Sequence, residues 1–215
     1  VRTVEAVSTI PSSIDSSNPE IIKTGLAAYT GVAGRPMINS VALERLDTIK
    51  LVTDNNAHVI VTAAGESGMP DNAKERVENI AQLMVHIQDA GIPLGDVYID
   101  CLAFPIGVAP QYGNDYLDAV SAIREQYDPE VHITGGVSNV SFGLPKRRLV
   151  NDVFLHLAIE SGLDSGIIDP IPASIQKVLD LDLDSEPVKL AMDMLKGNDD
   201  YCMNFIQAFR DGRLD

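Results

Sequence analysis

Residues 135–145 read Gly-Gly-Val-Ser-Asn-Val-Ser-Phe-Gly-Leu-Pro, and this stretch decides the fold of the chain. An alternating, strand-like segment (131–134) precedes it, and a basic triplet (146–148) and an apolar helical run follow it. The pattern predicts a strand that ends in a loop of small and polar residues and continues into a helix. Such loops bring donors close to a bound ligand, although Gly-Gly and Ser-Asn are also ordinary turn residues that only connect. Asn139 is the leading candidate, because an amide donates and accepts hydrogen bonds at once.

The same order of strand and helix recurs along the whole chain. Six segments are strand-like: 7–14, 36–38, 57–64, 97–99, 131–134 and 165–168. Amphipathic helical segments separate them, and alternation with short connections predicts a parallel β/α architecture. The nearly continuous apolar run 57–64 is typical of a strand buried on both faces. A doubly wound sheet is the alternative, but the glycine patterns that bind phosphates in such sheets do not occur here.

Polar residues follow the predicted strands at the points where they end. Five of the six strands close on a carboxylate or an amide: Asp15, Asn39, Asp100, Asn139 and Asp169. In a (β/α)8 barrel all carboxyl ends of the strands converge on one mouth, where ligands bind. We therefore expect a polar ring around one cavity. Some of these residues could instead cap the following helix, as Ser40 is expected to do, and Asp169 is the weakest member because Pro170 follows it.

The predicted fold class is α/β, a (β/α)8 TIM barrel in a single domain over residues 1–215. Such a barrel has eight units and typically about 250 residues. The chain has 215 residues and shows six units. We therefore expect the first two βα units to be missing, so that the domain is incomplete at its N-terminus. An open sheet of this kind would expose unpaired strand edges.

Composition narrows the function. The net charge of −15 argues against a nucleic-acid partner, which requires clustered Lys and Arg. No apolar run approaches the roughly 20 residues that cross a bilayer, so no membrane partner is expected. The two cysteines are far apart, and the four histidines have no metal-ligand spacing. These features predict no metal site and a cytoplasmic location.

At this point the residues resemble a known family. The loop 136–145, together with 151–155 and 162–164 downstream, is similar to the methyltetrahydrofolate:corrinoid methyltransferases, which include the folate domain of cobalamin-dependent methionine synthase. The strand ends at Asp15, Asn39 and Asp100 match the other signature positions in the same order. The resemblance covers essentially the whole chain, and several ordered motifs are more specific than any one of them.

The resemblance implies a pterin-binding barrel that passes the N5-methyl group of methyltetrahydrofolate to a corrinoid. It implies that Asp15, Asn39 and Asp100 hydrogen-bond the pterin ring and that Asn139 lies near N5. Ser138 and Arg147 complete the predicted substrate-binding set. Asn139 and Asp100 are the predicted catalytic residues, since Asn139 can strengthen a hydrogen bond as charge changes at N5 and Asp100 can hold a proton-delivering water. Phe142 stands where related members carry Gln or another polar residue.

The resemblance also implies that the cobalamin is carried by a partner protein or domain, and it is compatible with a homodimer. One alternative is a pterin enzyme similar to dihydropteroate synthase. That family carries Ser-Arg-Lys in the corresponding late strand, whereas this chain has Asn139-Val140-Ser141. The other alternative is a folate-binding subunit without catalytic activity, completed by a partner chain.

Overall fold

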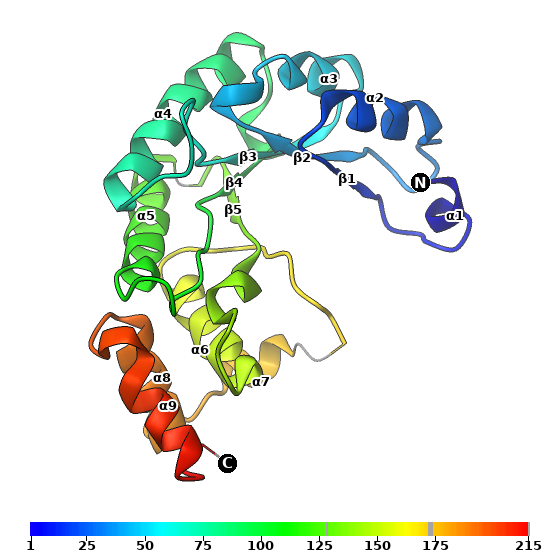
Figure 1. The fold of residues 1–215 in the computed structure, drawn as a ribbon. Helices are drawn as coiled ribbons and strands as arrows, with labels where there is room; N and C mark the ends of the chain where they lie inside the picture. Colours follow the sequence, from blue (N-terminus) through cyan, green and yellow to red (C-terminus); the bar gives the residue numbers. More distant parts are fainter. Residues whose placement is uncertain (128, 172–173, 215) are drawn as a thin grey trace. The chain divides into compact units, whose positions relative to one another are not determined.

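The computed structural model describes residues 1–127, 129–171 and 174–214 and shows strands and helices in alternation (Figure 1). The described chain forms two compact units. The first comprises residues 1–71, 75–100 and 127–132, and the second comprises 72–74, 101–126 and 133–215. Each unit is organised around its own group of buried side chains.

Parallel strands form the centre of the first unit. They are β1 (Ser13–Asp15), β2 (Met37–Val41), β3 (His58–Thr62) and β4 (Val97–Asp100), and with β5 (His132–Thr134) they follow chain order in one five-stranded sheet. Ile14 lies opposite Ile38 and Val59 opposite Val97, and the β2–β3 register shifts between Asn39 and Val41. The prediction of a parallel α/β sheet is therefore confirmed, and the described residues form five strands where six were expected.

Helices cover one face of this sheet. They are α2 (Pro19–Ala28), α3 (Thr48–Asp54) and α4 (Ala73–Asp89), with a short α1 (Arg2–Glu5) before them and 3-10 turns at Leu43–Arg45 and Leu94–Asp96. Figure 1 shows α2, α3 and α4 on the same side of the strands. The apolar residues of β1–β4 that alternate with the polar ones are buried there, among them Ile38, Val59 and Ile99, each fully buried.

The start of α2 has the local sequence pattern of a capped helix. Asn18 Oδ1 accepts a hydrogen bond from the backbone N–H of Glu20 at 2.9 Å, and Pro19 occupies the first helical position. An Asn cap satisfies an N–H that has no partner inside the helix, and Pro at this position loses nothing because its missing N–H would be unpaired anyway.

An ion-paired cluster closes the amino end of the sheet in the first unit. Arg35 donates from Nη1 and Nη2 to the two carboxylate oxygens of Asp96 at 2.7 and 2.6 Å, and from Nε to the carbonyl of Asn56 at 2.7 Å. His58 Nδ1 lies 3.1 Å from Asp96 Oδ1. The Arg35 guanidinium lowers the pKa of Asp96, while burial lowers the pKa of His58. This cluster joins the segments before β2, β3 and β4.

Three sequence-based expectations for local structure are wrong. The strand expected over 7–14 is present only at Ser13–Asp15, because Ser8 bonds the backbone of Ile10 through its hydroxyl and Pro11 has no N–H for a ladder. Ser40 does not cap a helix. It lies inside β2, which continues to Val41, and its hydroxyl accepts from Arg45 at 3.2 Å.

The sixth expected strand, 165–168, does not form a strand. The N–H groups of Ser165 and Ile167 donate to the carbonyls of Ile133 and Gly135. The carboxylate of Asp164 accepts a hydrogen bond from the N–H of Ile133 at 3.0 Å. In a parallel ladder this N–H group would donate to a carbonyl of the neighbouring strand. A side chain therefore replaces the strand pairing at this position.

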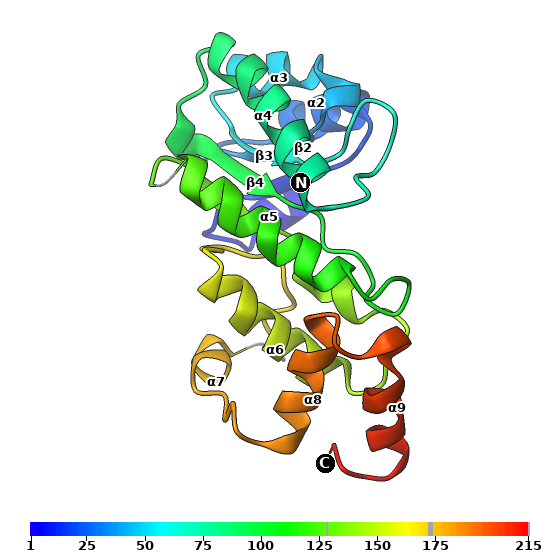
Figure 2. The same ribbon diagram turned by 90° about the vertical axis from the view of Figure 1, so that its left-hand side faces the viewer.

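The second unit is mainly helical. Its helices are α5 (Tyr112–Tyr127), α6 (Arg147–Glu160), α7 (Ile175–Leu179), α8 (Glu186–Leu195) and α9 (Met203–Arg210), with 3-10 turns η3 (Val137–Ser141) and η4 (Asp200–Cys202). Tyr116 of α5 and Phe154 of α6 meet at 5.1 Å between ring centroids and are fully buried. Figure 2 shows α8 and α9 side by side. Gly113 allows close approach to α8, since a Cβ there would lie 2.0 Å from the Leu195 carbonyl oxygen.

Candidate functional site

Three of the predicted site residues lie on strands of the first unit. Asp15 and Asp100 end β1 and β4 as expected, whereas Asn39 lies inside β2, which continues to Val41. Asp15 and Asn39 are direct partners in the β1–β2 register. Asn39 pairs with Ile60 on β3, and Ile60 pairs with Tyr98 on β4. Asp100 follows Tyr98 by two residues and pairs with Thr62. Because side chains alternate between faces, all three polar residues belong to the same face of the sheet.

Burial differs along this row. Asp15 is exposed, Asn39 is half-buried and Asp100 is only 9% exposed. Thr62 on the neighbouring strand is 8% exposed and adds a hydroxyl to the same face. Carboxylate and amide oxygens accept hydrogen bonds, so this edge suits a ligand that presents several N–H donors. Thr62, the last residue of β3, was not predicted, because the apolar run continues past it to Ala64.

In the second unit, Ser138 and Asn139 lie on η3, directly after β5. The turn is built from backbone bonds between Asn139 N–H and Gly136 carbonyl at 3.1 Å and between Phe142 N–H and Asn139 carbonyl at 3.2 Å. A Cβ at position 136 would come within 3.2 Å of the Asn139 side-chain nitrogen, so glycine gives this amide room to lie against the backbone. Asn139 is exposed and Ser138 is half-buried.

Arg147, at the start of α6, is tied to the same turn. Its Nε donates to Ser141 Oγ at 3.0 Å, and its Nη2 donates to the Ser138 carbonyl at 3.1 Å. Ser141 is fully buried and donates its own hydroxyl to the Ser138 carbonyl at 3.2 Å. The guanidinium also lies 4.7 Å from the centre of the Phe142 ring. Arg147 and Ser141 together hold the backbone that carries Asn139.

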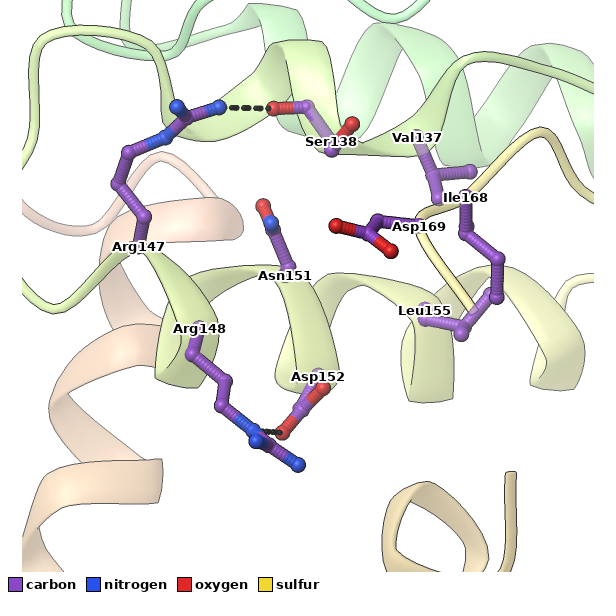
Figure 3. A pocket seen from close by; sticks show the side chains of 9 residues that line it. All are labelled: Val137, Ser138, Arg147, Arg148, Asn151, Asp152, Leu155, Ile168 and Asp169. Carbon is purple, nitrogen blue, oxygen red and sulfur yellow. Dashed lines mark hydrogen bonds and ion pairs between the residues drawn. The ribbon is translucent and has the colours of Figure 1, made fainter. Parts of the chain in front are cut away.

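A cavity of about 400 Å³ opens between η3 and α6. Its lining combines an apolar base with charged and polar groups: Val137, Ser138, Arg147, Arg148, Asn151, Asp152, Leu155, Ile168 and Asp169. Figure 3 shows Asn151 rising from α6 toward the space between Ser138 and Asp169. Asn151 Oδ1 is buried and has no hydrogen-bond partner among the residues that the structure describes. An unpaired buried acceptor is costly, and a ligand with an N–H or O–H group would satisfy it.

Two charges of α6 pair across one helical turn at the edge of this cavity. Arg148 Nε lies 3.5 Å from Asp152 Oδ2. Burial raises the pKa of the Asp152 carboxyl, and the nearby charges of Arg148 and Lys177 partly oppose that effect. Asp169 uses Oδ1 to accept the N–H of Ile171 at 3.0 Å. The lining of this cavity therefore holds two arginines and two aspartates.

Sequence reasoning gave no role to Arg148, Asn151 or Asp152. The spacing could have found them, because Arg147, Asn151 and Leu155 recur at four-residue steps, as do Arg148 and Asp152. Asp169, predicted as the weakest strand-end residue, does line the cavity.

Comparison with known proteins identifies the family. Residues 1–169 match the model of the pterin binding enzymes.

The chain belongs to the pterin-binding enzyme family.

The curated relatives of this pterin-binding enzyme include a methyltransferase and two methionine synthases. The methylcorrinoid:tetrahydrofolate methyltransferase of Eubacterium limosum is 29% identical over 98% of this chain and 74% of that protein. The methionine synthase of Mycobacterium leprae (strain TN) is 35% identical over 75% of this chain. The chain spans only 14% of the length of that methionine synthase. The resemblance stated from the sequence is confirmed.

Among solved structures, the dihydropteroate synthase of Xanthomonas albilineans in complex with 7,8-dihydropteroate is similar to this pterin-binding enzyme. The TM-score is 0.60 at 20% identity, over 82% of this chain and 69% of that one. The likeness confirms the predicted barrel type of fold. Within the part of the chain that the structure describes, no three or more His, Cys, Asp or Glu side chains are grouped to hold a metal ion, and no helix is long and apolar enough to cross a membrane.

Proposed function

We propose that this pterin-binding enzyme transfers the N5-methyl group between methyltetrahydrofolate and the cobalt of a corrinoid. The observation that carries the proposal is its similarity to the Eubacterium limosum methyltransferase over 98% of the chain, in a member of the pterin-binding family. The match to a methionine synthase agrees with the resemblance to the folate domain of cobalamin-dependent methionine synthase. The corrinoid is assigned to a partner protein or domain, and the reaction to the cytoplasm. Association into a homodimer belongs to the same proposal.

Asp15, Asn39 and Asp100 are assigned to the pterin ring. A pterin presents N–H donors along its pyrimidine edge, and carboxylates accept such bonds in charge-assisted, geometrically selective form. The backbone register that places Asp15 opposite Asn39, with Asp100 one pleat beyond on the same face, supports this assignment. Asp100 is 9% exposed, so its bonds to a ligand would be weakly screened by water.

Asn139 is assigned to N5 of the folate. When the methyl carbon leaves N5 for cobalt, the electron pair of the carbon–nitrogen bond stays on N5 and the new cobalt–carbon bond takes its pair from Co(I), which becomes Co(III). N5 must carry a proton, or a strong hydrogen bond, because the group that would otherwise leave is the anion of a secondary amine, which is a very poor leaving group. An amide that strengthens its bond as this charge changes lowers the barrier without being the proton source. A water held by Asp100 is assigned the proton delivery.

Calorimetry with methyltetrahydrofolate tests the binding half of the proposal. We expect saturable binding that is lost in Asp100→Asn and weakened in Asn39→Ala, while the exposed Asp89→Asn serves as a matched control with unchanged affinity. A folded chain that binds no methyltetrahydrofolate would contradict the proposal.

A methyl-transfer assay tests the catalytic half. Cob(I)alamin and methylcobalamin differ in their visible spectra, so transfer in either direction can be followed directly. Binding without transfer would favour the folate-binding subunit. Condensation of p-aminobenzoate with a pterin pyrophosphate would favour the dihydropteroate synthase alternative.

A further inference from the structure

Strand β2 has an irregularity directly after Asn39. Asn39 pairs with Ile60 of β3, but Val41, two residues later, pairs with Val61, which is the very next residue of β3. Ser40 is therefore one extra residue in β2, which is the geometry of a β-bulge. A bulge changes the direction of the side chains around it, so the backbone at Ser40 controls the orientation of both of its neighbours.

The extra residue places Asn39 and Val41 on opposite faces of the sheet. In a regular strand, residues two apart share a face. Here Asn39 shares the face of its partner Ile60, whereas Val41 shares the face of its partner Val61 and is fully buried. Without the extra residue, Val41 would leave the core or Asn39 would turn into it. The orientation of Asn39 therefore depends on the irregularity at Ser40.

The side chain of Ser40 is held by Arg45, which ends the 3-10 turn after β2. Arg45 Nη2 donates to Ser40 Oγ at 3.2 Å, and Ser40 is only 9% exposed. Arg45 Nη1 donates to the carboxylate of Glu44. The backbone N–H of Arg45 donates to the carbonyl of Ala42 at 2.9 Å, which closes the turn. The guanidinium is thus bonded to the bulge by one nitrogen and anchored within the turn by another.

The contact lies where the strand ladder gives Asn39 the least support. Toward β1 the ladder is regular, and the Asn39 carbonyl accepts the N–H of Ser16 at 2.8 Å. Toward β3 the register is interrupted at Ser40, and Arg45 supplies a side-chain bond at that point. Arg45 Nε is buried and has no hydrogen-bond partner among the residues that the structure describes. A buried N–H without a partner is destabilising, so stability alone does not account for this arginine.

We propose that Arg45 is a positioning residue for pterin binding, which fixes Ser40 at the bulge and thereby orients the side chain of Asn39. The inference rests on the proposed function, since it takes Asn39 as a contact of the pterin ring. Arg45 itself is assigned no contact with the folate. Because Asn39 is assigned to the ring and not to the reacting N5, loss of Arg45 should weaken binding and leave the rate of the bound complex unchanged.

Calorimetry with methyltetrahydrofolate measures the effect on binding. Arg45→Ala should weaken the affinity about fivefold to tenfold, as expected for loss of one charge-assisted hydrogen bond. Ser40→Ala, a smaller truncation, should weaken it about threefold to fivefold. In the methyl-transfer assay, KM should rise by the same factors while kcat stays within twofold. Circular dichroism and melting temperature establish that each variant is folded.

A double-mutant cycle tests whether Arg45 acts through Asn39. In the Asn39→Ala background, Arg45→Ala should change the affinity less than twofold, because no amide remains to be oriented. Arg2→Ala, which removes an exposed arginine of the same unit, is the matched control and should leave the affinity unchanged in both backgrounds.

Two results would overturn the inference and leave the proposed function intact. Additive losses in the cycle would mean that Arg45 contributes independently of Asn39. Unchanged affinity in folded Arg45→Ala and Ser40→Ala, with a lower melting temperature, would give both residues a structural role only. A folded wild-type chain that binds no methyltetrahydrofolate would overturn the proposed function together with the inference.

Discussion

The two compact units hold their candidate ligand-binding residues by different means. In the first unit, Asp15 and Asp100 end their strands and Asn39 lies inside β2, and the backbone ladder sets the positions of all three. In the second unit, Asn139 stands on a 3-10 turn of five residues that side chains hold in place. Buried Ser141 donates to the Ser138 carbonyl and accepts from Arg147, so its one hydroxyl joins both segments.

This difference indicates which substitutions should affect catalysis and which should affect folding. A strand ladder distributes its stability over many backbone bonds, so substitutions around it change stability before they change the positions of its side chains. A short 3-10 turn has few backbone bonds of poorer geometry and depends on individual side chains. We expect substitutions in the first unit that avoid the strand ends to affect folding, and substitutions around η3 to affect catalysis.

The largest effect is expected for Asn139→Ala. Loss of a hydrogen bond made mainly in the transition state should lower kcat about 100-fold with a small change in KM, as for removal of one oxyanion donor. Steady-state methyl transfer to cob(I)alamin measures this, with exposed Gln88→Ala as a control. A loss of binding as large as the loss of rate, seen equally with a folate that is unreactive at N5, would contradict the assignment.

The next effect concerns the bond between Ser141 and Arg147. Ser141→Ala removes the acceptor for Arg147 Nε and should lower kcat about tenfold by displacing the turn that carries Asn139. Because the two residues act through each other, Ser141→Ala and Arg147→Gln should be non-additive in a double-mutant cycle. Full additivity would mean that Ser141 does not position the turn through Arg147.

For the Arg35–Asp96 pair of the first unit, we expect a change in stability with little change in catalysis. Asp96→Ala leaves Arg35 and His58 without a carboxylate partner and should lower the free energy of unfolding by about 1–3 kcal/mol. At a temperature where the variant is folded, kcat should change less than twofold. Chemical denaturation and the methyl-transfer assay measure the two quantities, with exposed Asp89→Ala as the control. A large fall in kcat would contradict the expectation that substitutions in the first unit away from the site affect folding and not catalysis.

The smallest effect is a dependence of stability on pH. Burial and the charge of Arg35 lower the pKa of His58, against the opposing charge of Asp96, and His132 lowers it further. A histidine whose pKa is lower in the folded state binds more protons when unfolded, so stability is lost as pH falls below the ordinary histidine pKa of about 6.5 and through the lower folded value. His58→Gln should flatten this slope, and His86→Gln on the exposed side of α4 should not. An unchanged slope in His58→Gln would show that other groups cause it.

Asp96 acts in a lower pH window. Its pKa is lowered mainly by the hydrogen bond from Arg35, so its contribution is present above the ordinary Asp range and is lost as pH falls through the folded value. The contributions of His58 and Asp96 therefore fall in different pH ranges and can be separated by measuring the free energy of unfolding as a function of pH.

Much of this molecule could be predicted from local sequence. Alternating segments predicted parallel strands and helices, and Asn18-Pro19 predicted the start of α2. The strand-end rule predicted Asp15, Asn39 and Asp100 because period-two alternation and the end of an apolar run are both local signals. The same rules failed at 165–168 and at Ser40. There a carboxylate from another segment, or the continuation of a strand, decided the backbone conformation.

The sequence by itself determined the order of elements, the family resemblance and the identity of the polar residues that end the strands, since each is encoded in spacing along the chain. Only the tertiary structure decided that Asp15 faces Asn39 in the ladder, that Ser141 holds Arg147, and that Arg148, Asn151 and Asp152 line one cavity with Asp169. These relations depend on register and packing between segments far apart in sequence. Local propensity does not specify which side chain contacts which partner. The pairing depends on tertiary packing, because a side chain must be buried and hydrogen-bonded at the same time.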